Sequence, residues 1–521
     1  MDYDAIVIGA GHNGLASAIM LADKGWKVLV LEKGTEPGGA AKTGQVTIPG
    51  FQHDLFSMNI KLFLNSRFYK KHQDEMHEYG FEPVISDKPY ACVFPDGTGI
   101  AAHQNRKKMF KSIARHSAND TYAWNDLDHL YDQVAPHLLS LMQTEIPSIQ
   151  SGKVLMKAFK ELKLKRSLEV GSQLLKSPRQ FVDSWFENDK VKALFFPWGY
   201  QMDFGPDISA GAAFPLIEAI DSFRHGTPFS KGGVNKIIKA MVKMLEARGG
   251  HLQTNQQVDE VIIEGKTAKG VRLANGETIY AKKAVIGNVT PTQLVNQLID
   301  KHKLPDSYFE KANDFHYGPG TMMIHLALDE PLEWKAGEEF SESAYVHIGP
   351  YTEDLARTHV QAMNGILPDS PFLMVGQPDT IDQTRSPEGK ATIWLMVRVL
   401  PAHPKGDALG KINSSSWDEM KEQYADRIID KLAEYTTGTK EKILARTVFS
   451  PEDLQTENPN LVGGDLMAGS MQMFQNFVFR PVAGYSRYHT PVKNLYMIGA
   501  STWPGGGLNA ASGYLLGEKL G

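Results

Sequence analysis

The feature that most constrains the fold is a glycine-rich turn between an apolar run and a helical pattern near the start of the chain. The run Asp4–Ile8 has the length of a buried strand, and Gly9, Gly11 and Gly14 follow it in the G-x-G-x-x-G spacing. The first glycine permits a tight turn, the second lets a pyrophosphate approach the backbone, and the third lets the helix pack on the strand. A helix that begins there directs free N–H groups at phosphate. We therefore expect a Rossmann-like dinucleotide-binding unit.

A second strand, Lys27–Leu31, ends at Glu32. A carboxylate at this distance accepts a hydrogen bond from a ribose 2′-OH, which favours FAD or NAD over NADP. The chain has no second unit of this spacing, because Gly232-Gly233 and Gly463-Gly464 lack it. We therefore expect one dinucleotide to bind in this manner and expect no separate NAD(P)H domain.

The bulk composition narrows the class of protein. At 521 residues the chain exceeds the size of one ordinary core, so we expect two domains. A net charge of -5 argues against nucleic acid as a partner. No apolar run approaches the ~20 residues that span a bilayer, and the early fingerprint leaves no room for a cleavable signal. We expect a cytoplasmic location.

Cys92 is the only cysteine. One cysteine cannot form an intrachain disulfide, and it excludes the redox pair of a flavoprotein disulfide reductase. It also excludes a zinc or iron–sulfur site built on cysteines. The 17 histidines show no H-x-x-H grouping, so we expect no metal site. The apolar run Tyr90–Phe94 around Cys92 predicts a buried structural thiol.

The middle of the chain predicts more of the same α/β unit. A loop of small residues from Pro37 to Lys42 lets a ligand lie close to the backbone. A helix is expected over 236–247, and Gly249-Gly250 closes it. Strands are expected over 258–263, 268–273, 278–281 and 284–288, with an Asn275-Gly276 hairpin turn before the third.

Two blocks differ from this unit. Residues 100–225 read as helical, and residues 317–440 contain strand-like runs at 321–328 and 392–399 and a helix over 417–435. The chain then closes with a strand over 494–499, a glycine-rich loop over 500–507, and a final helix that starts at Leu508. The start of that helix would direct N–H groups at the pyrimidine edge of a flavin, where negative charge develops on reduction.

With these pieces assembled, the chain resembles the phytoene-desaturase-like flavoproteins of the amine-oxidase-like FAD superfamily. The segments that carry the resemblance are Gly9–Leu15, Glu32, Pro37–Gly39, Gly232-Gly233, Val258–Asn288, Arg480-Pro481, Tyr488–Pro491, Leu495-Tyr496 and Pro504–Gly507. One departure is Ala40-Ala41, because many relatives have an arginine directly after the paired glycines. Any contact of that arginine is therefore not transferred to this chain.

The resemblance implies an α/β fold with a Rossmann-like FAD-binding domain and an inserted α+β substrate-binding domain. The FAD-binding domain would comprise residues 1–95, 228–300 and 441–521, and the substrate-binding domain residues 96–227 and 301–440. The expected cofactor-binding residues are Gly9, Gly11, His12, Asn13, Gly14, Glu32, Lys33, Gly38, Gly39, Ala40, Ala41, Val258, Asn288, Gly499, Ala500, Gly506, Gly507, Leu508 and Asn509.

The function that the resemblance implies is hydride transfer between flavin N5 and an apolar or conjugated, polyene-like small molecule. The direction stays open among desaturation, saturation and isomerisation, with oxygen or a quinone as the acceptor. One alternative is a flavin amine oxidase, which needs an aromatic pair around the amine; Tyr485, Tyr488 and Trp503 are the candidates. Another is a non-enzymatic, FAD-bound interaction protein.

No catalytic residue is assigned. Tyr200, Asp203 and His225 lie in or near an aromatic stretch that could line a pocket, although a packed core segment is the favoured interpretation. His325 alternates within an apolar strand and is expected to be a core histidine. Neither the oligomeric state nor the acid or base of the reaction follows from the sequence.

The segment Lys153–Leu168 predicts a basic amphipathic helix. Lys153, Lys157 and Lys160 share one face, and Leu155, Phe159 and Leu162 share the opposite one. Such a helix could rest on an anionic membrane surface, which would suit extraction of a lipophilic substrate. The favoured interpretation is a surface helix whose apolar stripe meets the core.

Overall fold

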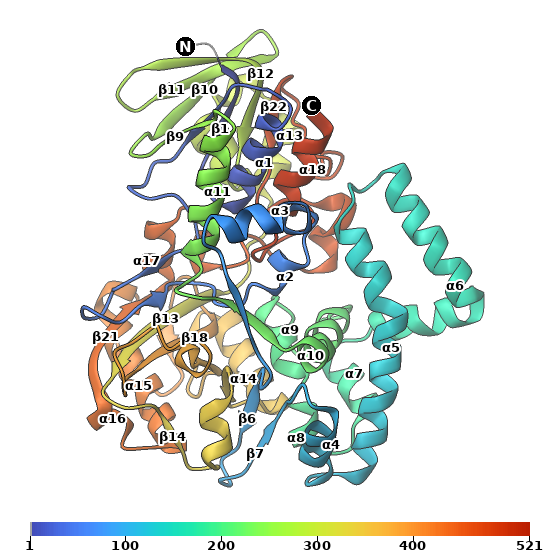
Figure 1. The fold of residues 1–521 in the computed structure, drawn as a ribbon, viewed down its shortest axis with the longest axis vertical. Helices are drawn as coiled ribbons and strands as arrows, with labels where there is room; N and C mark the ends of the chain where they lie inside the picture. The colour runs from blue at the N-terminus through green and yellow to red at the C-terminus, as the bar shows by residue number, and fades with distance from the viewer. Residues whose placement is uncertain (1–2, 521) are drawn as a thin grey trace.

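The computed structural model describes residues 3–520 and contains two seven-stranded sheets, each at the centre of one lobe (Figure 1). The first sheet has the order β10-β11-β12-β1-β2-β9, and β22 pairs with β12. Its strands are β1 (Tyr3–Ile8), β2 (Val28–Leu31), β9 (His251–Gln253), β10 (Val258–Glu264), β11 (Thr267–Leu273), β12 (Thr278–Gly287) and β22 (Leu495–Met497).

Parallel pairing at the centre of this sheet explains its unbroken apolar strands. β1 pairs in parallel with both β2 and β12. Ala5 and Val7 face a layer of α1 (His12–Ala22), α11 (Asn235–Ala247) and α18 (Ala511–Leu520), whereas Ile6 and Ile8 face the β10–β12 side. Both faces are covered, so alternation of polar and apolar residues disappears.

The predicted strands of this lobe are confirmed to within two residues at either end, with one difference. The strands expected over 278–281 and 284–288 form the single strand β12. Its residues 278–280 pair with β11 and its residues 281–287 with β1, and the register shifts at the exposed Lys282 and Lys283. The hairpin turn lies where the Asn275-Gly276 pair predicts it, and Gly276 has a φ of 87°. A positive φ at this position favours glycine.

The second sheet has the order β21-β13-β18-β17-β15-β6-β7. Its strands are β6 (Ala91–Val93), β7 (Gly99–Ala101), β13 (Gly320–Leu328), β15 (Tyr345–Ile348), β17 (Leu373–Gly376), β18 (Ala391–Leu400) and β21 (Ile443–Phe449). β6 and β21 come from segments that we expected in the cofactor domain, 1–95 and 441–521. Since both strands pair within this sheet, the expected boundaries need correction at these two strands.

Helices cover both faces of the second sheet. Ile393, Leu395 and Val397 of β18 pack with α15 (Trp417–Tyr435), whereas Trp394 and Met396 face the helices of block 100–225. Those helices are α4 (Arg106–Ala114), α5 (Ala118–Met142), α6 (Ile149–Leu174), α7 (Pro178–Trp185), α8 (Asp189–Lys192), α9 (Phe196–Gln201) and α10 (Ala213–His225).

Shorter elements complete the fold. The remaining helices are α2 (Lys61–Leu64), α3 (Arg67–Glu78), α12 (Pro291–Gln293), α13 (Asp306–Asn313), α14 (Thr352–Met363), α16 (Thr439–Lys442) and α17 (Pro451–Glu457). The remaining strands form pairs: β3 (Thr43–Gly44) with β4 (His53–Asp54), β5 (Pro83–Ser86) with β8 (Thr227–Ser230), β14 (Glu333–Trp334) with β20 (Thr436–Thr437), and β16 (Ile366–Leu367) with β19 (Gly406–Asp407).

α6 corrects one interpretation of the sequence. Together with α5 it projects from the body of the molecule (Figure 1), and its helical dihedrals are interrupted at Lys163, where φ is 60°. Leu155, Phe159 and Leu168 are 58%, 51% and 65% exposed. Of the predicted stripe, Leu155 and Phe159 therefore face outward, whereas Leu162 is half-buried, so the interpretation that this stripe meets the core is wrong for two of its three residues.

The two ends of the chain meet where α1 packs on α18. A Cβ added at Gly513 would lie 1.9 Å from the Asn13 carbonyl oxygen, and one at Gly517 would lie 2.4 Å from Met20 Cβ. The Ser512 hydroxyl donates to Asn13 Oδ1 at 2.9 Å. Only glycine allows helix backbones to approach this closely.

The final helix begins at Ala511, three residues after the expected start at Leu508. Ala510 has a φ of 57°, which is outside the helical region, and Asn509 Oδ1 accepts a hydrogen bond from the Ala511 N–H at 2.9 Å. The asparagine side chain thus satisfies one of the free donors at the helix start. Residues 505–510 belong to the loop.

Gly513→Ala tests this packing against a matched helical glycine. The added methyl group must separate α1 from α18, so we expect the free energy of unfolding to fall by about 1–3 kcal/mol. Gly171→Ala in α6 is the control, because nothing lies within 4 Å of its added Cβ. We expect that change to be neutral or stabilising by up to ~1 kcal/mol. Equal denaturant midpoints for the two variants would contradict the close contact.

Candidate active site

A cavity of about 430 Å³ lies between the two lobes and is lined by both. The expected cofactor-binding residues that line it are Gly9, Gly11, His12, Asn13, Glu32, Lys33, Gly38, Gly39, Ala40, Ala41, Val258, Asn288, Gly499, Ala500, Gly507 and Leu508. Residues from both ends of the chain and from its middle thus meet at one site.

Gly14, Gly506 and Asn509 are not part of the cavity wall. A Cβ at Gly14 would lie 2.2 Å from the Gly9 carbonyl oxygen, so this glycine serves helix–strand packing. A Cβ at Gly506 would lie 2.7 Å from the Met467 carbonyl oxygen, and Asn509 Nδ2 donates to the Gly505 and Gly507 carbonyls at 3.2 Å. These three residues shape the loops behind the wall.

The first glycine turn presents free donors to the cavity. Gly11 is the N-cap of α1 and supplies no side-chain cap, so the first N–H groups of the helix remain available to a phosphate. Glu32 accepts the Ala10 N–H at 2.8 Å and the Gly34 N–H at 2.9 Å. Each carboxylate oxygen keeps a further lone pair, which a ribose hydroxyl can use.

The second glycine loop docks directly on the first. The Gly38 N–H donates to the Ala10 carbonyl at 3.0 Å, and Gly38 and Gly39 have φ values of 137° and 60°. A Cβ at Gly39 would lie 3.4 Å from Gly11 Cα. The paired glycines therefore allow both the backbone conformation and the close approach.

His12 joins this turn to the closing loop. Burial lowers the pKa of His12 to about 4, against the effect of a hydrogen bond that the ring donates to the Gly507 backbone, which raises it. The ring is therefore neutral at physiological pH, and its Nε2 lies 3.0 Å from Asn13 Nδ2. Phosphate binding at this turn would depend on backbone dipoles rather than on a histidine charge.

The opposite side of the cavity is formed by the second lobe, and we call it the substrate wall. Its residues are Phe56, Ser57, Met58, Asn59, Trp198, Gln201, Tyr345, Met374, Trp394, Met396 and Arg398. Trp394, Met396 and Arg398 alternate along β18 and so point to the same face of the sheet. Sequence reasoning missed this wall, although an arginine within the apolar run 391–400 was a usable signal.

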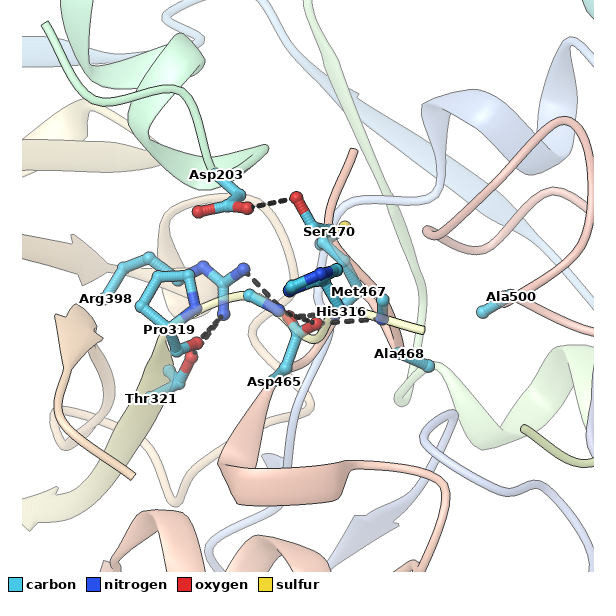
Figure 2. Close-up of polar contacts among 12 residues, drawn as sticks. Asp203, His316, Pro319, Thr321, Arg398, Asp465, Met467, Ala468, Ser470 and Ala500 are labelled. Carbon is cyan, nitrogen blue, oxygen red and sulfur yellow. Dashed lines mark hydrogen bonds and ion pairs between the residues drawn. The ribbon is translucent and has the colours of Figure 1, made fainter. Parts of the chain in front are cut away.

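A buried ion pair stands behind this wall (Figure 2). The Arg398 guanidinium donates to Asp465 Oδ1 at 3.0 Å. Asp465 also accepts the N–H groups of Gly318 and Gly469 at 2.8 Å and of Met467 at 3.0 Å. Its carboxylate thus fixes the segment 466–468, which lines the cavity.

Asp203 borders the same network. Its carboxylate accepts the Ser470 hydroxyl at 2.5 Å, and burial raises its pKa to about 6. Figure 2 shows it on the far side of Ser470 from the cavity-lining Ala468. Tyr200 is buried and its hydroxyl donates to the Leu355 carbonyl, whereas His225 is exposed and pairs with Asp221. None of the three candidates lines the cavity.

The other residues singled out from the sequence have structural positions. Cys92 is fully buried, its thiol donates to the Ala193 carbonyl, and burial raises its pKa, as expected for a structural thiol. His325 is a buried core histidine beside His53, and burial lowers its pKa to about 4. Within residues 3–520, no group of three or more His, Cys, Asp or Glu side chains is arranged to hold a metal ion.

The aromatic residues proposed for an amine oxidase are in the wrong place. Tyr485 packs on Tyr308, the Tyr488 hydroxyl donates to the Trp503 carbonyl at 3.1 Å, and the Trp503 indole donates to Thr144 at 2.9 Å. Tyr485, Tyr488 and Trp503 are absent from the cavity wall. These three residues make structural contacts away from the cavity instead.

Comparison with known proteins identifies the class. The sequence profile of the flavin containing amine oxidoreductase family matches residues 14–508. The chain belongs to this family. Both the α/β fold class and the resemblance to phytoene-desaturase-like flavoproteins are thereby confirmed, and the protein is a flavin-dependent oxidoreductase with FAD as its cofactor.

Individual relatives are more distant. Pyridine nucleotide-disulfide oxidoreductase domain-containing protein 2 of Rattus norvegicus is 27% identical over 98% of this chain and 92% of its own length. The neurosporene-forming phytoene desaturase of Cereibacter sphaeroides is 24% identical over 98% and 92%. An oxidoreductase from Methanosarcina mazei has the same fold, with a TM-score of 0.62 at 17% identity over 100% and 99% of the two chains.

The residues of the cavity fit this cofactor. The uncapped start of α1 suits the pyrophosphate, Glu32 suits the ribose, and the 499–508 segment at the other end suits the ring. FAD supplies the redox chemistry as an acceptor or donor of hydride. The chain supplies binding, orientation and the apolar surroundings.

Asp203→Asn gives a pH-dependent test of the buried network. The folded protein holds the Asp203 proton up to about pH 6, whereas an unfolded aspartate loses it near its ordinary value of 3.8. By linkage, the free energy of unfolding falls as pH rises between these values, by up to about 3 kcal/mol. Asparagine does not ionise, so it removes this pH-dependent loss of stability, and it tolerates the φ of 67° at this position.

We therefore expect Asp203→Asn to be more stable than the wild type at pH 8 and to lose that advantage near pH 4. Denaturant unfolding at the two pH values measures the difference. Asp207→Asn in the same loop is the control: Asp207 pairs with Arg179 but is 68% exposed, and an exposed ion pair contributes at most about 1 kcal/mol at either pH. A wild-type advantage at pH 8 would show that ionised Asp203 stabilises the fold.

Proposed function

We propose that the protein transfers hydride between an apolar, polyene-like carbon substrate and flavin N5, as in desaturation. The observation that carries the proposal is the composition of the substrate wall. Seven of its eleven residues have apolar or aromatic side chains, and no acidic side chain belongs to it. An apolar molecule gains free energy by leaving water for such a surface. A relative of this chain is a phytoene desaturase.

The amine oxidase alternative finds less support. An ammonium group needs an aromatic cage or a carboxylate, and the candidate aromatic residues lie outside the cavity. The one charged side chain of the substrate wall, Arg398, has hydrogen-bond donors and no acceptor, so it cannot bind an ammonium group. The non-enzymatic alternative predicts a flavin that no carbon substrate reduces.

Anaerobic reduction of the purified, yellow protein tests the proposal. We expect a polyene hydrocarbon to bleach the visible absorbance of the bound flavin and a primary alkylamine to leave it unchanged. Denaturation should release FAD in a one-to-one ratio to the chain. Bleaching by the amine alone would favour an amine oxidase, and bleaching by neither compound nor by a fatty acyl compound would favour the non-enzymatic alternative. A colourless protein that cannot be reconstituted would refute both reactions.

We also propose that α6 rests on an anionic membrane surface. The helix holds six lysine or arginine residues and two glutamates in a chain whose net charge is -5. Leu155, Met156, Phe159, Leu164 and Leu168 are more than half exposed. Basic residues beside exposed apolar ones are typical of helices that lie in the headgroup region of a bilayer.

Residues 474–479 add exposed apolar side chains beside this surface of α6. Val154 of α6 packs with Phe477 and Trp503, and Phe474 and Phe479 are 57% and 51% exposed. A membrane contact here would bring a lipophilic substrate to the surface of the protein. Across residues 3–520, no helix is both long enough and apolar enough to cross a bilayer, so such contact would be peripheral. The cytoplasmic location stays a prediction.

Sedimentation with vesicles tests the membrane contact. We expect the protein to sediment with anionic vesicles and to stay in the supernatant with zwitterionic ones, because lysines contribute about 1 kcal/mol each near an anionic surface. Leu155→Ser with Phe159→Ser should weaken vesicle binding at least tenfold, since each side chain contributes about 1.5–3 kcal/mol when buried. The control pair is Val360→Ser with Met363→Ser on α14, where exposure is similar, 60% and 51%. Equal loss in both pairs would argue against α6.

A further inference from the structure

We propose that Arg398 binds a carboxylate on an otherwise apolar substrate, so that the protein acts on an apolar carboxylic acid. The proposal rests on the proposed function and narrows its substrate class. Arg398 lies on β18 in the substrate wall, next in alternation to Trp394 and Met396. It is the one charged side chain of that wall and is only 1% exposed.

The guanidinium group keeps unused donors. It has five N–H bonds. Nη1 donates to the Pro319 carbonyl at 3.0 Å and to Thr321 Oγ1 at 2.8 Å, and Nη2 donates to Asp465 at 3.0 Å. Nε has no hydrogen-bond partner among residues 3–520. A buried donor without a partner destabilises the fold, and a carboxylate oxygen would satisfy it through a charge-assisted bond.

Asp465 does not depend on Arg398 alone for its hydrogen bonds. Three backbone N–H groups, those of Gly318, Met467 and Gly469, already hold its carboxylate in place. The aspartate is fully buried and belongs to the loop that shapes the cofactor side of the cavity. Because the backbone also satisfies the Asp465 carboxylate, Arg398 can bind a second anion as well.

A second buried arginine, Arg480, belongs to the same cluster of buried groups. Arg480 is fully buried and donates to the carbonyls of Gly469, Ser470 and Ala500, with no carboxylate within ion-pair distance among residues 3–520. Asp203 is the other carboxylate of the cluster, and it shares its charge with the Ser470 hydroxyl. Two arginines thus balance two aspartates, so the cluster holds no excess negative charge, and the free N–H groups of Arg398 suit an acceptor such as a carboxylate and not an ammonium donor.

The geometry of the donor matches the group proposed. A guanidinium fork binds a carboxylate with two parallel hydrogen bonds, which an alcohol or an ether cannot reproduce. The apolar neighbours Trp394 and Met396 would contact the carbon chain next to that carboxylate. The substrate class is therefore an acid with a long or cyclic hydrocarbon body.

Three ten-carbon probes test the proposal on the FAD-loaded protein: decanoate, decanol and decylamine. Their binding is measured by calorimetry and by quenching of tryptophan fluorescence, because Trp198 and Trp394 line the cavity. We expect decanoate to bind at least tenfold more tightly than decanol, and decylamine to bind most weakly. Equal binding of the three probes, binding of none, or preference for the amine overturns the proposal.

Arg398→Gln identifies the residue responsible. On protein preparations matched for FAD content, we expect the ratio of decanoate to decanol affinity to fall to about one in this variant, and we expect Arg398→Lys to give an intermediate ratio. Arg427→Gln is the control, because Arg427 pairs with Asp407 outside the cavity wall. A decanoate preference that survives in Arg398→Gln overturns the assignment. If that variant does not fold, Arg398→Lys and the wild-type probe series decide the matter.

The outcomes separate this proposal from the proposed function. If polyenes bleach the flavin and the wild type shows no preference for decanoate, the proposed function stands and Arg398 has no such role. If the wild type prefers decanoate and no carbon compound bleaches the flavin, the site exists and the proposed function fails.

Discussion

The close packing of α1 on α18 is the contact on which the site depends. Gly513 and Gly517 let the two helix backbones pack in direct contact, and Asn13 Oδ1 accepts a hydrogen bond from the Ser512 hydroxyl across the same interface. The two helices follow the first glycine turn and the closing loop, about 500 residues apart in the chain. Their contact therefore places the two loops beside one cavity, and neither loop alone could enclose a cofactor of the length of FAD.

The second lobe gives this cavity its chemical character. Alternate residues of β18 present two apolar side chains and one arginine to the cavity, while the residues between them pack on α15. Asp465 pairs with Arg398, and Met467 of the same loop packs on Gly506. The substrate wall and the cofactor loops are therefore held in fixed positions relative to each other. Rigid support of this kind orients a substrate against a bound cofactor.

Much of the cofactor side could be predicted from sequence because its signals are local. The spacing of Gly9, Gly11 and Gly14, the position of Glu32 and the paired glycines at 38 and 39 each follow from backbone geometry that few residues satisfy. The start of α18 was misplaced because Asn509 and the positive φ of Ala510 define it, and neither is evident from apolar periodicity.

The substrate side could not be predicted in the same way. β18 is buried on both faces, so its sequence does not distinguish the cavity face from the α15 face. The network of Asp203, Arg398 and Asp465 joins residues from three distant parts of the chain, and no spacing rule connects them. For α6, the amphipathic pattern is evident from the sequence. Whether its apolar side meets the core or faces outward depends on its neighbours in the fold, which the pattern does not reveal.

The most direct test of the account is an experimental structure of the FAD-loaded protein. We predict adenosine beside Glu32 and Val258, the pyrophosphate at the start of α1, and the flavin ring between the 499–508 segment and the substrate wall at Trp394 and Arg398. A flavin ring outside that gap, or a dinucleotide bound in the reverse direction, would contradict it.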